Sequence, residues 1–130
     1  MVDVVAAVIQ NEEGKILIAQ RNKKKAQGGL WEFPGGKIEP NETKEEAIVR
    51  EIKEEMDIDI VAKEFIDQRV FKYPEKDINL IAIKCKMVSG EVKLNEHEDA
   101  KWVDYRELKD FKFAPADLFI VKSFNNKRGS

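Results

Sequence analysis

The chain has 130 residues, and 23 Lys and Arg against 25 Asp and Glu leave a formal net charge of −2, so we expect one domain, residues 1–130, and no bulk nucleic-acid binder. The short basic clusters 23–25 and 127–128 are typical of solvated surface. No apolar run is long enough to span a bilayer, and Cys85 is the single cysteine, which argues against a membrane span or a disulfide framework and predicts a cytoplasmic protein.

The N-terminal third predicts a hairpin followed by a loop. Residues Val2–Gln10 and Lys15–Arg21 are rich in β-branched and apolar residues, which favours two strands. The segment between them, Asn11–Gly14, has the composition of a tight turn. Glycines and a proline then punctuate Gln27–Gly36, and we expect a loop there.

A helix is predicted to begin near Asn41 or Thr43 and to run to Met56. Both polar residues can cap a helix, acidic residues follow in the first turn, and no proline interrupts the run. One face of this helix is apolar and is expected to pack on the core, through Ile48, Val49, Ile52 and Met56.

Three carboxylates gather on another face of the same helix. Glu51, Glu54 and Glu55 stand at positions i, i+3 and i+4, which places their side chains side by side. Like charges at these spacings cost roughly 0.2 to 0.5 kcal/mol per pair, so the cluster favours a hard divalent cation that would compensate it. The alternative is a solvated, charge-rich helix whose acids pair with neighbouring lysines.

The second half predicts further strands and a closing helix. Strands are expected at Ile60–Phe71, Asn79–Val88 and Ala100–Val103, where β-branched and aromatic residues lie between turn signals. Proline near a helix start and apolar residues at helical spacing predict a helix over Leu118–Phe124. Residues 125–130 are expected to form a flexible tail. Mixed strands with helices on opposite sides indicate an α/β/α sandwich.

The spacing of the central motif resembles the signature of the Nudix hydrolases. Gly36 is followed after five residues by Glu42, and after seven more by Arg50-Glu51-Ile52-x-Glu54-Glu55-x-x-Ile58, so the motif spans residues 36–58. One position departs from the family: Asp57 stands where the signature has glycine, at the end of the helix. Aspartate tolerates the left-handed backbone expected there, so we expect a small cost in stability and no loss of a ligand.

The resemblance implies a single-domain Nudix sandwich with a mixed sheet, and a metal-dependent attack of water on a phosphoanhydride. By the same resemblance, Glu51, Glu54 and Glu55 hold Mg²⁺, with Mn²⁺ as the substitute ion, and the carbonyl of Gly35 contributes from the loop. Catalysis of this kind neutralises the phosphate charge and activates a water molecule.

The general base stays open between two residues. Glu54 can act as a ligand or as the base, and Glu96, in a late loop, is the other candidate for both roles, with Glu98 as the less favoured alternative. His97 is the only histidine; because carboxylates already serve the proton transfer, we expect a structural or peripheral role for it.

Three basic residues complete the expected site. Arg50 is expected to pair with Glu42 or to orient Glu51, because an arginine beside several acids is a ready bidentate partner. Because of this expected contact, we count Arg50 among the candidate catalytic residues. Lys37 and Arg21 are the candidates for contact with the phosphates.

Two further segments resemble the MutT-like branch of the family. Leu30–Lys37 matches its loop, and Phe113–Asp117 matches its nucleotide-reading end. In the 8-oxo-dGTP diphosphatases of this branch an asparagine stands at the position of Asp117, whereas Ala-Pro-Ala-Asp is similar to the CTP pyrophosphohydrolases. An ionised carboxylate only accepts hydrogen bonds, which favours the exocyclic amine of cytosine, while purine substrates stay open.

Other roles for these residues also stay open. Asp117 can instead be the N-cap of the last helix, without contact to a base. Phe33 and Tyr73 are candidates for stacking on the base, and each can equally be an ordinary core or surface aromatic residue.

The resemblance thus implies a Mg²⁺-dependent nucleoside triphosphate diphosphatase that cleaves normal or oxidised (d)NTPs to (d)NMP and pyrophosphate, in the sanitation of the nucleotide pool. The alternatives are a hydrolase of an ADP-sugar, a dinucleoside polyphosphate or an RNA 5′ end, and a non-catalytic nucleotide-binding Nudix domain. We expect a monomer or homodimer, with no membrane or stable nucleic-acid partner.

Overall fold

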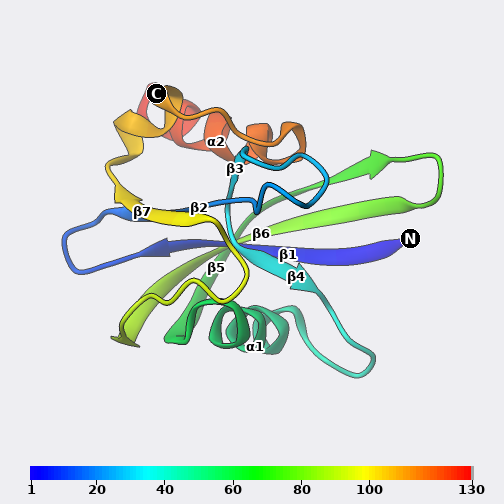
Figure 1. The fold of residues 1–130 in the computed structure, drawn as a ribbon, viewed down its shortest axis with the longest axis horizontal. Coiled ribbons are helices and arrows are strands. Elements are labelled where there is room, and N and C mark those ends of the chain that lie inside the picture. Colours follow the sequence, from blue (N-terminus) through cyan, green and yellow to red (C-terminus); the bar gives the residue numbers. More distant parts are fainter. Residues whose placement is uncertain (130) are drawn as a thin grey trace.

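A central sheet lies between two helices. The computed structural model describes the backbone of residues 1–129 and the side chains of residues 1–124; Ser130 lies outside the described residues. Helix α1 (Lys44–Met56) covers one face of the sheet and α2 (Leu118–Gly129) covers the other (Figure 1). The predicted α/β/α sandwich is confirmed. None of the described helices is long and apolar enough to cross a membrane.

Within the described residues, seven strands form one mixed sheet. Its main order is β3-β2-β1-β6-β5, while β4 pairs with β1 and β7 pairs with β2. The β1–β6 pair is parallel and the other pairs are antiparallel. The strands are β1 (Val2–Gln10), β2 (Ile16–Gln20), β3 (Trp31–Glu32), β4 (Gly35–Lys37), β5 (Ile58–Lys72), β6 (Asp77–Gly90) and β7 (Asp99–Val103).

The central strand β1 is buried on both faces. Val5, Ala7 and Ile9 pack on the α1 side of the sheet, and Ala6 and Val8 pack on the α2 side. A strand covered on both faces reads as a continuous apolar run, which is how residues 4–9 read in the sequence. The hairpin predicted at its end is confirmed, since β1 pairs with β2 through Gln10 and Ile16.

Local signals fix both ends of α1. Thr43 accepts the N–H of Glu46 at 3.0 Å and its own N–H donates to the Glu46 side chain at 2.9 Å, a capping box that satisfies two backbone donors. Asp57 ends the helix in the left-handed region, with φ 57°, as expected where the family has glycine. Ion pairs from Lys93 (3.2 Å) and Lys53 (3.6 Å) hold its carboxylate.

The core face of α1 differs from the prediction at one residue. Ile48, Ile52 and Met56 are fully buried, but Val49 is 38% exposed, so its placement toward the core was wrong. Val49 is one residue, or about 100°, around the helix from Ile48 and lies at the margin of the apolar stripe. Ala47, one turn before Glu51, is also fully buried.

The segment predicted as a loop, Gln27–Gly36, contains two short strands. β3 pairs with β2, and β4 pairs with β1, so the prediction of a continuous loop was wrong there. Later in the chain, a 3-10 helix over Tyr105–Asp110 was not predicted. Helix α2 continues to Gly129, whereas the side chains of the predicted tail, 125–130, lie outside the described residues.

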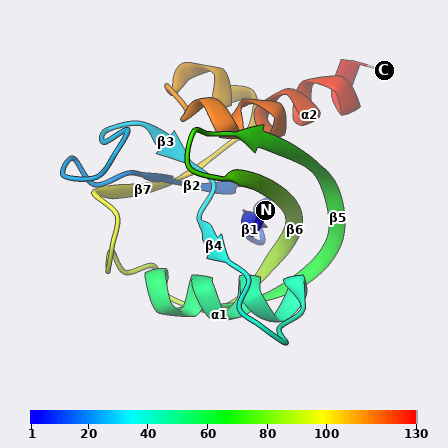
Figure 2. The same ribbon diagram turned by 90° about the vertical axis from the view of Figure 1, so that its right-hand side faces the viewer.

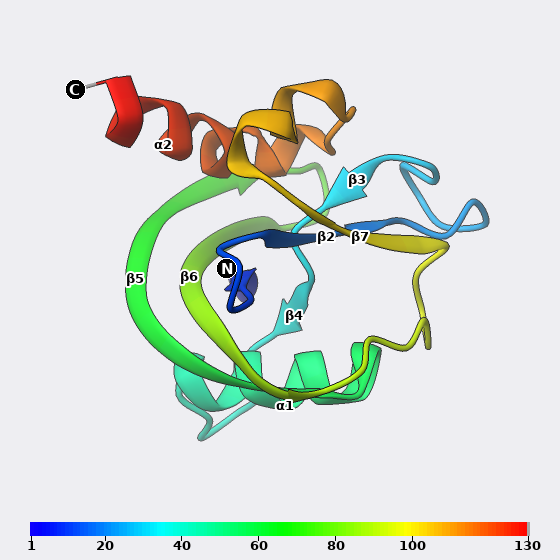
Figure 3. The ribbon, with the colours of Figure 1, turned by 90° about the vertical axis from the view of Figure 1, so that its left-hand side faces the viewer.

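The two longest strands shape the molecule. β5 and β6 curl together in an arc that runs from α1 to α2 (Figures 2 and 3). Their pairing contains irregularities at Asp59/Ile60, Ala62/Glu64 and Phe65/Asp67, and bulges of this kind bend a strand. Figure 3 also shows the segment between β6 and β7 passing the end of α1 on its way to β7. That passage brings residues 91–98 to the acidic helix.

Candidate active site

A polar cavity of about 140 Å³ lies where α1, β3, β4 and the segment before β7 meet. Three carboxylates and an imidazole line it, those of Glu32, Glu55, Glu96 and His97. The backbone of Gly35 and the basic residues Arg21 and Lys25 also line it. Of the residues expected from the sequence, the structure therefore brings Arg21, Gly35, Glu55 and Glu96 together.

Backbone contacts hold Glu96 beside the acidic helix. The N–H of Lys93 donates to the carbonyl of Met56 at 2.9 Å, and Asn95 donates to the carbonyls of Glu54 and Glu55 at 3.0 and 3.2 Å. These bonds satisfy carbonyls in the last turn of α1 that have no partner within the helix. They also fix the position of the next residue, Glu96, so that its side chain lines the cavity.

Two glycines allow the loop to approach the sheet and the helix. A Cβ at Gly35 would collide with the carbonyl of Val5 on β1, and a Cβ at Gly36 would collide with the carboxylate of Glu51. Gly35 has to be glycine because the obstacle is backbone, whereas a side chain at Gly36 would displace the Glu51 carboxylate from its present place. The glycine of the motif is therefore a cradle for the Glu51 carboxylate.

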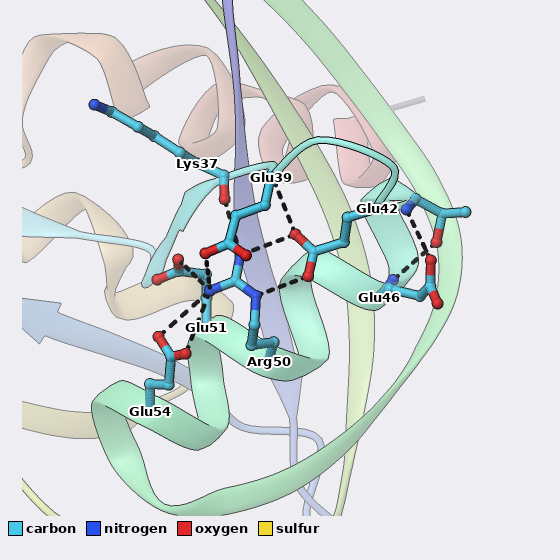
Figure 4. Close-up of polar contacts among 8 residues, drawn as sticks. Lys37, Glu39, Glu42, Glu46, Arg50, Glu51 and Glu54 are labelled. Atoms are coloured by element: carbon cyan, nitrogen blue, oxygen red, sulfur yellow. Dashed lines mark hydrogen bonds and ion pairs between the residues drawn. The ribbon is translucent and has the colours of Figure 1, made fainter.

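Arg50 organises the acids around α1 (Figure 4). Its guanidinium donates to both oxygens of Glu42, at 2.7 and 2.9 Å, to Glu51 at 2.9 Å and to the carbonyl of Lys37 at 3.1 Å. Hydrogen bonding to Arg50 lowers the pKa of Glu42 to about 2. Both expected roles of Arg50, pairing with Glu42 and holding Glu51, agree with this geometry.

The three carboxylates of α1 lie in different environments. Glu55 is 5% exposed, the Glu51 side chain is 17% exposed and the Glu54 side chain is 59% exposed. Burial, together with a hydrogen bond and charge repulsion from Glu51, raises the pKa of Glu55 to about 9. Glu54 touches Arg50 at 3.4 Å and does not line the cavity.

The chemistry of these donors fits a hard divalent cation. Glu55 and Glu51 are in hydrogen-bonding contact, with Glu96 and Glu32 close enough to add to the repulsion, so either a proton or a cation is needed to stabilise the group. Oxygen donors are the ligands that Mg²⁺ prefers. Among the described side chains, those of residues 1–124, however, no three of His, Cys, Asp or Glu converge closely enough to form a ready metal site.

A partly buried network that the sequence did not indicate crosses the cavity. Arg21 donates to Glu32 at 2.7 Å, the other oxygen of Glu32 is 2.9 Å from Nε2 of His97, and the same nitrogen is 3.8 Å from Glu55. Burial acts to raise the pKa of Glu32, but hydrogen bonds with His97 and Arg21 outweigh it and keep this pKa below its ordinary value. The His97 side chain is only 6% exposed and lies within hydrogen-bonding distance of Glu32, which agrees with the structural one of the two roles expected for it.

An open groove of about 430 Å³ adjoins the cavity and shares Arg21 with it. Tyr73, at the turn between β5 and β6, lines this groove, as a residue that contacts the substrate would. Lys37 is exposed and its side chain points away from the acids around Arg50 (Figure 4). Phe33 is 3% exposed and its ring stacks on Phe113 at 5.3 Å, so the ring lies in the core on the α2 side.

Asp117 is buried beneath the loop. It is 6% exposed, and its carboxyl accepts the N–H of Phe33 at 2.9 Å. Because this partner is far away in sequence, the hydrogen bond from Phe33 is not a helix cap. No cap hydrogen bond from a side chain is found for the short 3-10 helix Pro115–Asp117. Burial raises the pKa of Asp117 to about 7, although the hydrogen bond from the Phe33 N–H acts in the opposite direction and lowers this pKa.

Comparison with known proteins agrees with this geometry. The NUDIX domain model matches residues 2–124. A CTP pyrophosphohydrolase of Escherichia coli K12 is 37% identical over 124 residues, which cover 95% of this chain and 91% of that protein. An 8-oxo-dGTP diphosphatase of Haemophilus influenzae is 32% identical over 127 residues, covering 98% and 93%.

The fold itself has close structural neighbours. The crystal structure of a MutT protein from Methanosarcina mazei Go1 matches with a TM-score of 0.86 at 30% identity, covering 99% of this chain and 96% of that one. The sequence match and the structural match both extend over nearly the whole chain. On this evidence, and with the glycine cradle and acidic helix in place, the chain belongs to the Nudix hydrolase family.

Proposed function

We propose that this protein is a Mg²⁺-dependent nucleoside triphosphate diphosphatase that converts (d)NTPs, or their oxidised forms, to (d)NMP and pyrophosphate. The observation that carries the proposal is the contact between Glu51, which lies against Gly36, and the buried Glu55, which lines a cavity together with Gly35 and Arg21. The names of the relatives support the same reaction class.

The metal would be held by Glu51 and Glu55, with the carbonyl of Gly35 and the carboxylate of Glu96, which line the cavity together with Glu55. A divalent cation there would neutralise phosphate charge and activate water. Glu54 has a solvent-facing carboxylate at the edge of this group, and Glu96 lines the cavity, so both stay candidates for the general base. Mn²⁺ would substitute for Mg²⁺.

The protein side chains would position and cleave the triphosphate. Arg50 holds Glu51 against Gly36 by a charged hydrogen bond. Arg21, fixed by Glu32, would orient the phosphates. Water attacks the β-phosphorus, its oxygen stays on the released pyrophosphate, and the bridging oxygen leaves with the nucleoside monophosphate.

Two substrate groups remain in the proposal: 8-oxo-dGTP, and CTP or dCTP. Asp117 supports a cytidine substrate when it is ionised, because a carboxylate accepts from an exocyclic amine. When protonated it both donates and accepts, as an amide does. A pKa of about 7 makes both forms accessible near neutral pH.

The test is a substrate panel with Mg²⁺: CTP, dCTP, 5-methyl-dCTP, dGTP, 8-oxo-dGTP and 2-hydroxy-dATP, assayed for pyrophosphate. ADP-ribose and a dinucleoside polyphosphate serve as outgroups and are assayed for NMP. Pyrophosphate release from one or more triphosphates supports the proposal. Preference for an outgroup supports hydrolysis of another nucleoside diphosphate derivative, and inactivity throughout supports a nucleotide-binding domain without catalysis.

The cellular setting is part of the same proposal. We place the protein in the cytoplasm, as a monomer or homodimer that sanitises the nucleotide pool without a stable nucleic-acid partner. The buried Cys85, whose pKa burial raises to about 12, supports a structural thiol rather than a reactive one.

A further inference from the structure

The loop between β2 and β3 presents one of three consecutive lysines to the acidic cavity. Lys23, Lys24 and Lys25 are all exposed, and the sequence offers no reason to distinguish them. In the structure, Lys25 lines the cavity together with Glu55 and Glu96, whereas Lys23 and Lys24 do not.

Backbone hydrogen bonds hold Lys25 at this place. Its N–H donates to the carbonyl of Asn22 and its carbonyl accepts from Gly28, both at 3.0 Å. The next residue, Ala26, accepts from Nε of Arg21 at 2.9 Å. Two successive turns therefore fix the Cα of Lys25 beside Arg21, so the loop does not need to reorganise before the ammonium group can reach a ligand.

Charge makes Lys25 the available cation of the cavity wall. Arg21 is neutralised by Glu32 at 2.7 Å. In contrast, no carboxylate of the described part of the chain lies within ion-pair distance of Lys25. A lysine that is not paired within the protein keeps its donors free for an anion that enters the cavity.

We propose that Lys25 binds the polyphosphate of the nucleotide, as a specificity-determining residue that selects triphosphates over monophosphates. The inference rests on the proposed function and adds a contact residue to the same site. The metal-binding acids of the helix would approach one side of the phosphate chain, and Lys25 would approach it from the β2–β3 loop, beside Arg21.

The test compares Lys25→Met with Lys25→Arg, which keeps the charge, and with Lys24→Met, which removes a neighbouring charge outside the cavity. Calorimetry with Mg²⁺ at fixed ionic strength measures the binding of α,β-methylene-CTP, CMP and inorganic pyrophosphate. We expect Lys25→Met to weaken the triphosphate analogue and pyrophosphate about five- to tenfold. CMP should change less than about twofold, and Lys25→Arg should restore most of the loss. In steady state, the KM for CTP should rise more than kcat falls.

Equal losses in Lys25→Met and Lys24→Met would overturn the inference, because they would show a general effect of surface charge. An equal loss for CMP would overturn it as well. If the wild-type protein cleaves no triphosphate, the proposed function fails, but pyrophosphate binding by the variants still decides the role of Lys25.

Discussion

Replacement of Asp117 by asparagine should change the pH dependence of folding. Asp117 is 6% exposed, and its carboxyl accepts one hydrogen bond, from the N–H of Phe33 at 2.9 Å. Burial raises its pKa from 3.8 to about 7, with the charge of Glu32 adding to the effect and the Phe33 N–H opposing it. An amide has the same shape and can accept the same hydrogen bond, but it cannot ionise.

The sign follows from the protons bound in each state. Below pH 3.8 the carboxyl is protonated in both states. Between pH 3.8 and about 7 the unfolded chain has lost this proton and the folded chain keeps it, so stability falls as pH rises. The gap of about three pH units corresponds to about 4 kcal/mol, an upper limit because burial is incomplete. Above pH 7 both states are ionised and the loss stays constant.

Urea denaturation of the wild-type and Asp117→Asn proteins at pH 5, 6, 7, 8 and 9 measures this difference. The free energy of unfolding of Asp117→Asn minus that of wild type should rise by about 1–2 kcal/mol from pH 5 to pH 8. This rise does not depend on how much the two proteins differ in stability at pH 5. Asp59→Asn, which changes a carboxylate that is 54% exposed, controls for loss of one charge. Parallel profiles for wild type and Asp117→Asn would refute the reasoning. In kinetics, Asp117→Asn should mainly alter the relative kcat/KM among bases.

Three further predictions follow from the acidic helix and its surroundings. Glu51→Gln should lower kcat about 100-fold or more while circular dichroism shows an unchanged fold, because it removes a ligand charge; wild-type turnover would contradict the site. His97→Gln should lower Mg²⁺ affinity or kcat/KM about 10- to 100-fold, because His97 holds Glu32 and lies 3.8 Å from Glu55; titration with Mg²⁺ measures it, and unchanged values would speak against the network. Thr43→Ala should cost about 1 kcal/mol in urea denaturation through loss of the cap, and an unchanged midpoint would contradict that role.

The local sequence was sufficient to predict the acidic helix and its end at Met56, while it left the start open between Asn41 and Thr43, of which the structure has Thr43 as the cap. Thr43 and Glu46 stand at capping-box spacing, and Asp57 occupies the left-handed end position. These features depend only on residues within a few positions of one another, so they can be read without knowledge of the fold. The apolar and β-branched run Val2–Gln10 likewise predicted a strand, and the structure placed that strand at the centre of the sheet.

The depth of each carboxylate was decided by packing. Glu54 and Glu55 are neighbours on one helix, yet one side chain is 59% exposed and the other residue is 5% exposed. Helical spacing places them on the same side, but burial depends on which segment covers each one. The segment 93–95 follows β6 and is hydrogen-bonded to the end of α1, so its position depends on how the sheet pairs.

The sequence by itself determined the acidic helix, the glycine beside it and the Nudix family. Only the tertiary structure decided that Glu32 would meet His97, 65 residues away, and that Asp117 would bond to Phe33, 84 residues away. It also made strands of β3 and β4, because their hydrogen-bonding partners are distant strands. Such contacts leave no signal in the local sequence, because they depend on which remote segments the curved sheet places side by side.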